Sequence, residues 1–264
     1  YIPLPPPAEQ AAIVRFLDWA GGRVERAVRA KRRLIALLQE LKQVLIHRAV
    51  TGQVDVRTGQ PYPAYKPSDL PWLGPIPEHW EVRRVKYLFR EVDERSTTGK
   101  ETHLAMSQRL GLVPSDQVES SLRSESYAGG KLCKAGDLVL IRLKAHLGVF
   151  AVAHQNGVIS PDYSVFRQCA AIDISYYESL LRSSACRREL RILAKGIVEG
   201  FWRLYTDDFY DIRLPYPPKN EQTEIMASIA AGTSDLATAL TRLEREIELL
   251  RELRTRLVAD VVTG

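Results

Sequence analysis

Hydrophobic residues recur at heptad-like spacing in two long segments of the chain, one near each end. In both segments an extended proline-rich stretch, IPLPPPAEQ at 2–10 and IRLPYPPKNEQ at 212–222, leads into the periodic region. Proline is tolerated up to the first turn of a helix because its missing N–H would be unpaired there. The pattern therefore predicts two long helices, the first over about 8–49 and ~60 Å long at 1.5 Å per residue. Their expected apolar seam residues are Val28, Ile35, Leu38, Leu45, Leu240, Ile247, Leu250 and Leu257.

The two segments are copies of one another. A shift of 212 positions aligns 1–52 with 213–264 without a gap, down to the closing Val-Thr-Gly of each copy. Two helices with matching apolar stripes would most simply pair with each other as a coiled coil; the alternative is that each packs separately on a globular core. Lys31 departs from the seam where the second copy has Leu243, and a long basic side chain can extend from such a position to solvent.

The segment between the copies has a different pattern. Residues 53–69 are rich in Pro, Gly and aromatics, which indicates a linker, and a domain should begin near Leu70 and run to 211. Strands are predicted at 137–143 and 163–169, a hairpin at 148–159 with Asn156-Gly157 as its turn, and one helix at 174–194 with Leu180, Leu181, Cys186, Leu190 and Leu193 facing inward. The expected fold class is α+β, with one mixed α/β domain and two long helices.

Composition and charge narrow the function classes. The formal net charge is +5, and the surplus lies in residues 1–60, which hold 10 Lys/Arg against 5 Asp/Glu. Such a basic helical face can meet phosphates, although it can equally be a solvated face or a protein-docking surface. No apolar run approaches the ~20 residues of a membrane span and no secretory signal opens the chain, so a cytoplasmic location is expected. The three cysteines form no CxxC pair, which favours neither a zinc site nor a disulfide framework.

The order of several motifs resembles one family, the specificity subunits of type I restriction-modification systems. The resemblance rests on LPPPAEQAAIVRFLD and LPYPPKNEQTEI, on HRAVTGQVDVR and WLGPIPEHWEVRRVKYLF, and on the runs that begin GDLVLIRLKAHLG and KGIVEGFWRLYTDD, and it covers essentially the whole chain. Members of that family look like two target-recognition domains alternating with two long spacer helices that pair antiparallel. The resemblance implies spacer helices at 1–52 and 212–264, a linker at 53–69 and a single target-recognition domain at 70–211. Because the first helix lacks its domain, we expect that Tyr1 is the end of a truncated one.

The resemblance also implies a function. The chain would be a non-catalytic subunit that reads one half of a bipartite site in double-stranded DNA and docks methyltransferase subunits through its helices. Through them it would join a translocating endonuclease subunit. S-adenosylmethionine, ATP and magnesium would be supplied by those partners, with no cofactor in this chain. Two truncated chains could also pair with each other, and no membrane partner is expected.

Candidate DNA-reading residues lie near predicted strand ends, where loops carry function. Arg142, Lys144 and His146 would alternate on one face if the strand at 137–143 continues, and the alternative is a basic strand edge that guards against aggregation. A second cluster is Lys195 and Gly196 with Trp202 and Arg203, in which glycine would allow close approach to phosphate and Trp202 could instead be a core anchor.

Two weaker groups complete the candidates. Gln108 could pair with adenine, and Arg109 with guanine or phosphate, because their side chains offer the paired donors and acceptors that base edges require. Tyr163 follows a Ser-Pro-Asp turn and is the last of them.

The sequence offers no sign of catalysis. It contains no GxGxxG, phosphate loop, HExxH or Asn/Asp-Pro-Pro-aromatic motif, so neither catalytic nor metal-binding residues are expected. A nuclease or methyltransferase is thus the weakest alternative. A structural coiled-coil scaffold without DNA readout is a stronger one, since the charge of residues 61–211 is nearly balanced, at 20 Lys/Arg against 19 Asp/Glu. A steep loss of DNA affinity with salt would distinguish a DNA-binding subunit from that scaffold.

Overall fold

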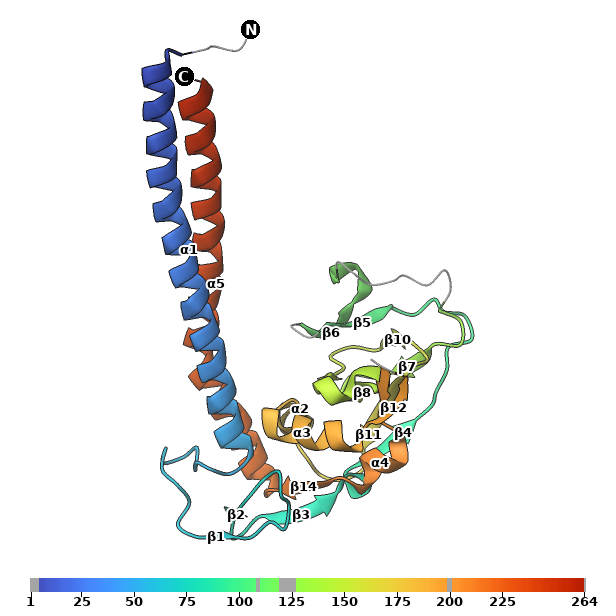
Figure 1. Cartoon of the computed structure of the whole chain (residues 1–264). Helices are drawn as coiled ribbons and strands as arrows, with labels where there is room; N and C mark the ends of the chain where they lie inside the picture. The colour runs from blue at the N-terminus through green and yellow to red at the C-terminus, as the bar shows by residue number, and fades with distance from the viewer. Residues whose placement is uncertain (1–4, 108–109, 119–126, 199–200, 264) are drawn as a thin grey trace. The chain divides into compact units, whose positions relative to one another are not determined.

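The computed structural model describes residues 5–107, 110–118, 127–198 and 201–263 (Figure 1). The chain divides into two compact units. A helical unit comprises Tyr1–Leu45 with Ala230–Gly264, and a mixed unit comprises Ile46–Ile229. The mixed helix-and-sheet content confirms the expected α+β class.

Two long helices, α1 (Pro7–Val50) and α5 (Lys219–Thr263), supply the helical unit. Both begin directly after prolines and carry a first-turn acid, Glu9 or Glu221, at the positive end of the helix dipole. The start of α1 lies within one residue of the position expected from these local signals. The expectation of two long helices is confirmed.

Within the helical unit the two helices contact each other and run antiparallel. Val24 and Val28 of α1 are buried against Ile247 of α5, with Ile35 and Leu250 packed beside them. Lys31 Nζ lies 2.5 Å from Glu246 Oε2, and Arg254 Nη1 lies 2.8 Å from Glu25 Oε1. Residue numbers along α5 therefore fall as those along α1 rise, which shows the antiparallel direction. Of the other expected seam residues, Leu38, Leu240 and Leu257 are half-buried, whereas Leu45 is 39% exposed. Heptad packing along the whole length of the helices stays a prediction.

The mixed unit is built on a four-stranded antiparallel sheet with the strand order β4-β11-β8-β9. Its strands are β4 (Phe89–Val92), β11 (Tyr163–Gln168), β8 (Leu138–Ile141) and β9 (Phe150–Val152). Alternate side chains of β8 and β11 enter two cores: Leu138 and Phe166 face one, and Val139 and Val165 face the other. Burial on both faces explains why β8 reads as a continuous hydrophobic run.

Two-stranded antiparallel ribbons surround that sheet in the described part of the unit. They are β1 (Tyr65–Lys66) with β2 (Ile76–Pro77), β3 (Glu81–Arg84) with β14 (Arg213–Tyr216), β5 (Leu104–Ser107) with β6 (Gly111–Pro114), β7 (Lys131–Cys133) with β10 (Gly157–Ile159), and β12 (Lys195–Val198) with β13 (Phe201–Arg203). The remaining elements are the helices α2 (Ile174–Leu181), α3 (Ser184–Leu193) and α4 (Thr206–Asp211) and the 3-10 turns η1 (Val85–Tyr87), η2 (Ser115–Gln117) and η3 (Arg142–Leu147).

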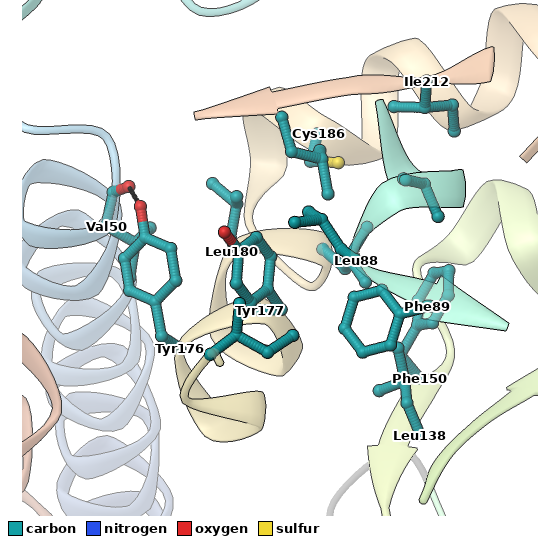
Figure 2. Packing of buried hydrophobic residues seen from close by; sticks show 14 of the residues in the cluster. Val50, Leu88, Phe89, Leu138, Phe150, Tyr176, Tyr177, Leu180, Cys186 and Ile212 are labelled. Carbon is teal, nitrogen blue, oxygen red and sulfur yellow. Dashed lines mark hydrogen bonds between the residues drawn. The ribbon is translucent and has the colours of Figure 1, made fainter. Parts of the chain in front are cut away.

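Aromatic side chains dominate the larger core of the mixed unit. Trp80, Phe89, Phe166 and Tyr177 are fully buried, and each such ring removes roughly 150–250 Å² from water. Tyr176 is buried as well, and its hydroxyl donates to Val50 O at 2.8 Å (Figure 2). The segment 53–69 contributes Tyr62, only 5% exposed, to the same core.

The expected hairpin at 148–159 is wrong. β9 pairs with β8 and β10 pairs with β7, so the two runs belong to different ribbons. Asn156 ties this segment to the residues after β7, since its side-chain Oδ1 accepts from Ala135 N at 2.9 Å. Gly157 is needed for close approach, since a Cβ there would lie 2.5 Å from Thr102 O.

Two further expectations need correction. The strand predicted over 137–143 ends at Ile141, and η3 follows it. The single helix expected over 174–194 is two helices, because Ser183 leaves the helical conformation and its hydroxyl accepts from Cys186 N as the cap of α3. The side chains of Leu180, Leu181, Cys186 and Leu190 are nevertheless buried, and Leu193 is half-buried, as predicted.

Candidate nucleic-acid interface

Two of the predicted clusters meet in the folded mixed unit. η3 packs against β13, and Leu204 N donates to Arg142 O at 3.3 Å. α3 packs against η3 from another side. We call η3, α3 and the ribbon β12–β13 the candidate surface. It joins segments that are some fifty residues apart in sequence, which no local pattern could have indicated.

η3 is fixed at both ends. At its start the Arg142 guanidinium donates from Nε to Asp162 O at 2.9 Å and from Nη2 to Pro161 O at 3.3 Å. At its end Gly148 has φ +66°, and a Cβ there would lie 2.4 Å from Arg187 Cγ of α3. The turn is thus held against α3 by close packing that only glycine permits.

The predicted alternation along residues 142–146 is wrong, because these residues form a 3-10 turn and not a strand. The side chains of Lys144 and His146 lie outside the described part of the structure. Arg142 is held to the turn that precedes β11 and remains partly exposed.

The ribbon β12–β13 places two cations directly opposite one another. Lys195 pairs with Arg203 across the strands, and both side chains approach the ring of Tyr205, at 5.7 Å for Lys195 Nζ and 5.8 Å for Arg203 Cζ. Asp208 of α4 accepts from Lys195 at 2.8 Å, and this contact raises the pKa of Lys195. The Nε atom of Arg203 is buried without a hydrogen-bond partner in the described part of the chain. Among the described residues, Lys195 therefore has a carboxylate partner and Arg203 has none.

Gly196 and Trp202 face one another on the same ribbon. Trp202 keeps 40% of its surface exposed and lies outside the buried clusters, so it is not the core anchor that was the alternative expectation. A Cβ placed on Gly196 would meet no atom within 4 Å, so this face of the ribbon is open. An exposed indole beside cations suits stacking or apolar contact with bases.

Helix α3 adds cations that the sequence analysis did not select. Arg188 and Arg191 are exposed and Arg187 is half-buried, while Ala185, Cys186 and Leu190 face the core. In the sequence these arginines alternate with the buried positions of an amphipathic helix. That pattern indicates a solvent-facing side of the helix, and only the packing of η3 on α3 shows that this side belongs to the candidate surface. Over its described side chains the candidate surface carries six cations and one acid: Arg142, Arg187, Arg188, Arg191, Lys195 and Arg203 with Glu189.

The remaining candidates lie outside the described residues or, for Tyr163, next to the start of η3. Gln108 and Arg109 lie outside the described residues, so their role stays a prediction. Tyr163 begins β11 opposite Ile141 and is half-buried; burial raises its pKa, and its hydroxyl hydrogen-bonds with the backbone of Met106. This tyrosine joins the sheet to the β5–β6 ribbon.

The described residues include no group of three or more His, Cys, Asp or Glu side chains placed to hold a metal ion. Burial raises the pKa of the Cys133 thiol to about 11 and raises that of Cys186 too, and Cys169 is an exposed free thiol. None of the helices in the part described is both long and apolar enough to cross a membrane.

The chain matches no protein-family model, whereas solved structures share its fold. One is a chain from a study of complex assembly and conformational transition of the type I R-M system, with 20% sequence identity and a TM-score of 0.65 over 100% of this chain and 61% of that one. Another is the HsdS subunit from Thermoanaerobacter tengcongensis, with 21% identity and a TM-score of 0.50 over 100% of this chain and 60% of that one. The chain thus has an HsdS-like fold and spans about three fifths of the length of these chains.

Proposed function

We propose that the chain is a non-catalytic DNA sequence-recognition subunit of a type I restriction-modification complex and reads one half of a bipartite site. The observation that carries this proposal is the convergence of η3, α3 and β12–β13 into one cationic surface on an HsdS-like fold. The near-balanced charge of the central segment, which favoured a scaffold, conceals this local excess of cations.

The contacts can be divided by chemistry. Arg188 and Arg191, exposed at the spacing of one helical face, suit phosphate contacts that position the duplex without reading it. Arg203 and Trp202 suit base edges and thymine methyl groups in a groove. The guanidinium of Arg142 has two of its nitrogens engaged with backbone oxygens, so its remaining N–H groups are presented in a fixed direction.

The long helices suit the docking of methyltransferase subunits. Apart from the seam, α1 exposes a second apolar stripe at Leu34, Leu37, Leu41 and Val44, each between 44% and 53% exposed. The repeat places Leu249 and Leu253 of α5 at the positions equivalent to Leu37 and Leu41, and both are 47% exposed. Exposed leucines at helical spacing are typical of a protein-docking face. Two equivalent stripes fit two methyltransferase subunits, which would bring S-adenosylmethionine and recruit the ATP- and magnesium-dependent endonuclease subunit in the cytoplasm.

Mapping of methylated bases tests the proposal. The chain is co-expressed with the methyltransferase subunit of its own system, and the methylated sequence is compared with that produced after residues 70–211 are replaced by another such domain. We expect a complex and a changed half-site. Failure to form a complex, or an unchanged methylated sequence after the exchange, would refute the proposal.

A point variant tests the surface itself. Arg203→Gln should relax the preference at a base of the half-site, since a good bidentate contact contributes about 1–3 kcal/mol of discrimination. Lys100→Gln is the matched control, because Lys100 is an exposed loop cation of the same unit and belongs to none of the elements that form the candidate surface. Equal methylation patterns for the two variants would remove Arg203 from readout.

A further inference from the structure

A second cationic concavity lies in the mixed unit, away from the candidate surface. It is a groove of about 790 Å³ between the β1 segment and the ribbon β3–β14. Four cations line it, Lys66, Arg83, Arg84 and Arg213, together with the ring of Tyr87 and the carboxylate of Asp69. We call this concavity the ribbon groove.

Two cations of the ribbon groove repel each other across the ribbon. Arg84 and Arg213 are directly opposite partners on β3 and β14, and like charges in that position destabilise a ribbon. Asp211 lies 3.5 Å from Arg84, but both side chains are largely exposed, so this pair compensates little. The structure gives Arg213 no carboxylate partner among the described residues. An anion in the groove would relieve the repulsion.

Two further side chains of the ribbon groove are Arg83 and Tyr87. The guanidinium of Arg83 is held over the ring of Tyr216, with Cζ 3.8 Å from its centroid, and Glu81 Oε2 lies 2.8 Å from its Nη2 and compensates its charge, so the uncompensated charge of the groove comes from the other cations. Tyr87 is 61% exposed beside the cation of Lys86. Fixed guanidinium groups and an exposed ring favour phosphate with sugar or base packed beside it.

We propose that the ribbon groove binds backbone phosphates of DNA outside the bases read by the candidate surface, an inference that rests on the proposed function. An acidic protein partner fits less well, because protein interfaces depend on buried apolar or aromatic anchors and the groove offers few apolar side chains, Ile76 and Val82 among them, with Ile76 already fully buried. One DNA duplex is long enough to contact both the candidate surface and the ribbon groove. The chain from Arg203 to Arg213 contains the short helix α4, which limits the separation of these residues to about 25 Å, less than the roughly 34 Å of one DNA turn.

The test uses the full chain in complex with its methyltransferase subunit and carries Arg84→Gln with Arg213→Gln. DNA affinity is measured between 50 and 200 mM salt on duplexes with and without the recognised half-site. Loss of two phosphate contacts lowers the slope of log affinity against log salt by about 1.8, so the wild type should lose roughly 12-fold more affinity than the variant over this range. Specific and nonspecific binding should weaken by the same factor, because phosphate contacts carry no sequence information.

The matched control is Arg90→Gln with Lys100→Gln, which removes two exposed cations of the same unit that do not line the groove. A salt slope equal to that of the control overturns the inference. Two other results also overturn it. Unchanged DNA binding together with weaker methyltransferase association would assign the groove to a protein partner. Equal salt slopes for the wild type and the variant, together with binding of pyrophosphate to the wild type alone, would assign the groove to a small phosphate ligand. Absence of sequence-specific binding in the wild type would instead refute the proposed function, so the two failures are distinguishable.

Discussion

Glu221, in the first turn of α5, is a buried carboxylate whose removal should strongly destabilise the mixed unit. Its carboxylate is only 4% exposed. It accepts from Tyr62 Oη at 2.6 Å and Trp80 Nε1 at 3.0 Å, and its other oxygen lies 2.7 Å from His79 Nε2. Burial, together with the hydrogen bond to Glu221, raises the pKa of Tyr62, so this hydroxyl stays a donor across the working pH range. One carboxylate thus joins the start of α5 to three residues of the segment before β3.

The magnitude follows from the donors that Glu221→Ala would leave without an acceptor. Tyr62 Oη and Trp80 Nε1 are buried, and a hydrogen bond to a charged group contributes about 1.5–3 kcal/mol. His79 is half exposed and can turn to water, so its loss adds little. The free energy of unfolding of the mixed unit should therefore fall by about 3–5 kcal/mol. For a unit of this size the melting temperature should drop by roughly 6–20 °C.

The repeat supplies the matched control. Glu9 stands at the equivalent position of α1 and is exposed, and in the described part of the chain no side chain donates a hydrogen bond to it. Glu9→Ala should change stability by no more than ~0.5 kcal/mol. Urea unfolding followed by tryptophan fluorescence and circular dichroism measures both variants. Equal midpoints for the two, or a loss below about 1 kcal/mol for Glu221→Ala, would refute the reasoning.

Three further predictions concern other parts of the chain. Burial and the charge of Arg188 lower the pKa of His47 below its ordinary value of 6.5, so the unfolded chain binds the proton more readily than the folded chain. The free energy of unfolding should therefore fall as the pH drops below 6.5. Urea titrations at several pH values should show that His47→Gln removes this dependence. Gly148→Ala should lower the melting temperature more than Gly136→Ala, because both glycines have positive φ but only the Cβ at 148 would clash, 2.4 Å from Arg187 Cγ; equal shifts would contradict this. Ile247 is 7% exposed, and Ile247→Ala should destabilise the helical unit by about 2–4 kcal/mol in thermal unfolding. Leu249 is 47% exposed, and Leu249→Ala should leave the stability unchanged but weaken co-purification of the methyltransferase. A larger loss of stability for Leu249→Ala than for Ile247→Ala would reject the assigned seam.

The sequence was most informative where structure depends on local signals. The proline entry, first-turn acid and apolar period placed α1, expected over about 8–49, to within a residue at each end, because each signal acts within a turn of the helix end. The register of the seam was less certain. Lys31 lies within the seam beside Glu246, whereas Leu45 is exposed, because the pairing of two helices selects one of several apolar stripes.

Strand partners could not be predicted, because pairing is decided by residues distant in sequence. The run at 148–159 has the composition of a hairpin, yet β9 joins β8 and β10 joins β7. The end of β8 at Ile141 also depends on distant contacts, since η3 is held by Asp162 and by α3. The break at Ser183 was a local signal that was missed, as a serine cap followed by helix formers is a recognisable helix start.

Helix α4 explains how the mixed unit tolerates two pairs of opposed cations. Lys195 faces Arg203 on the ribbon before α4, and Arg84 faces Arg213 on the ribbon that includes the strand after it. Asp208 of α4 pairs with Lys195, and Asp211 at the end of α4 pairs with Arg84, so one short helix partly compensates one cation of each pair. The second cation of each pair, Arg203 or Arg213, has no carboxylate partner in the described residues. A fold selected only for stability would have little reason to keep two such uncompensated arginines, whereas a fold that holds a polyanion requires cations whose charge is not already satisfied.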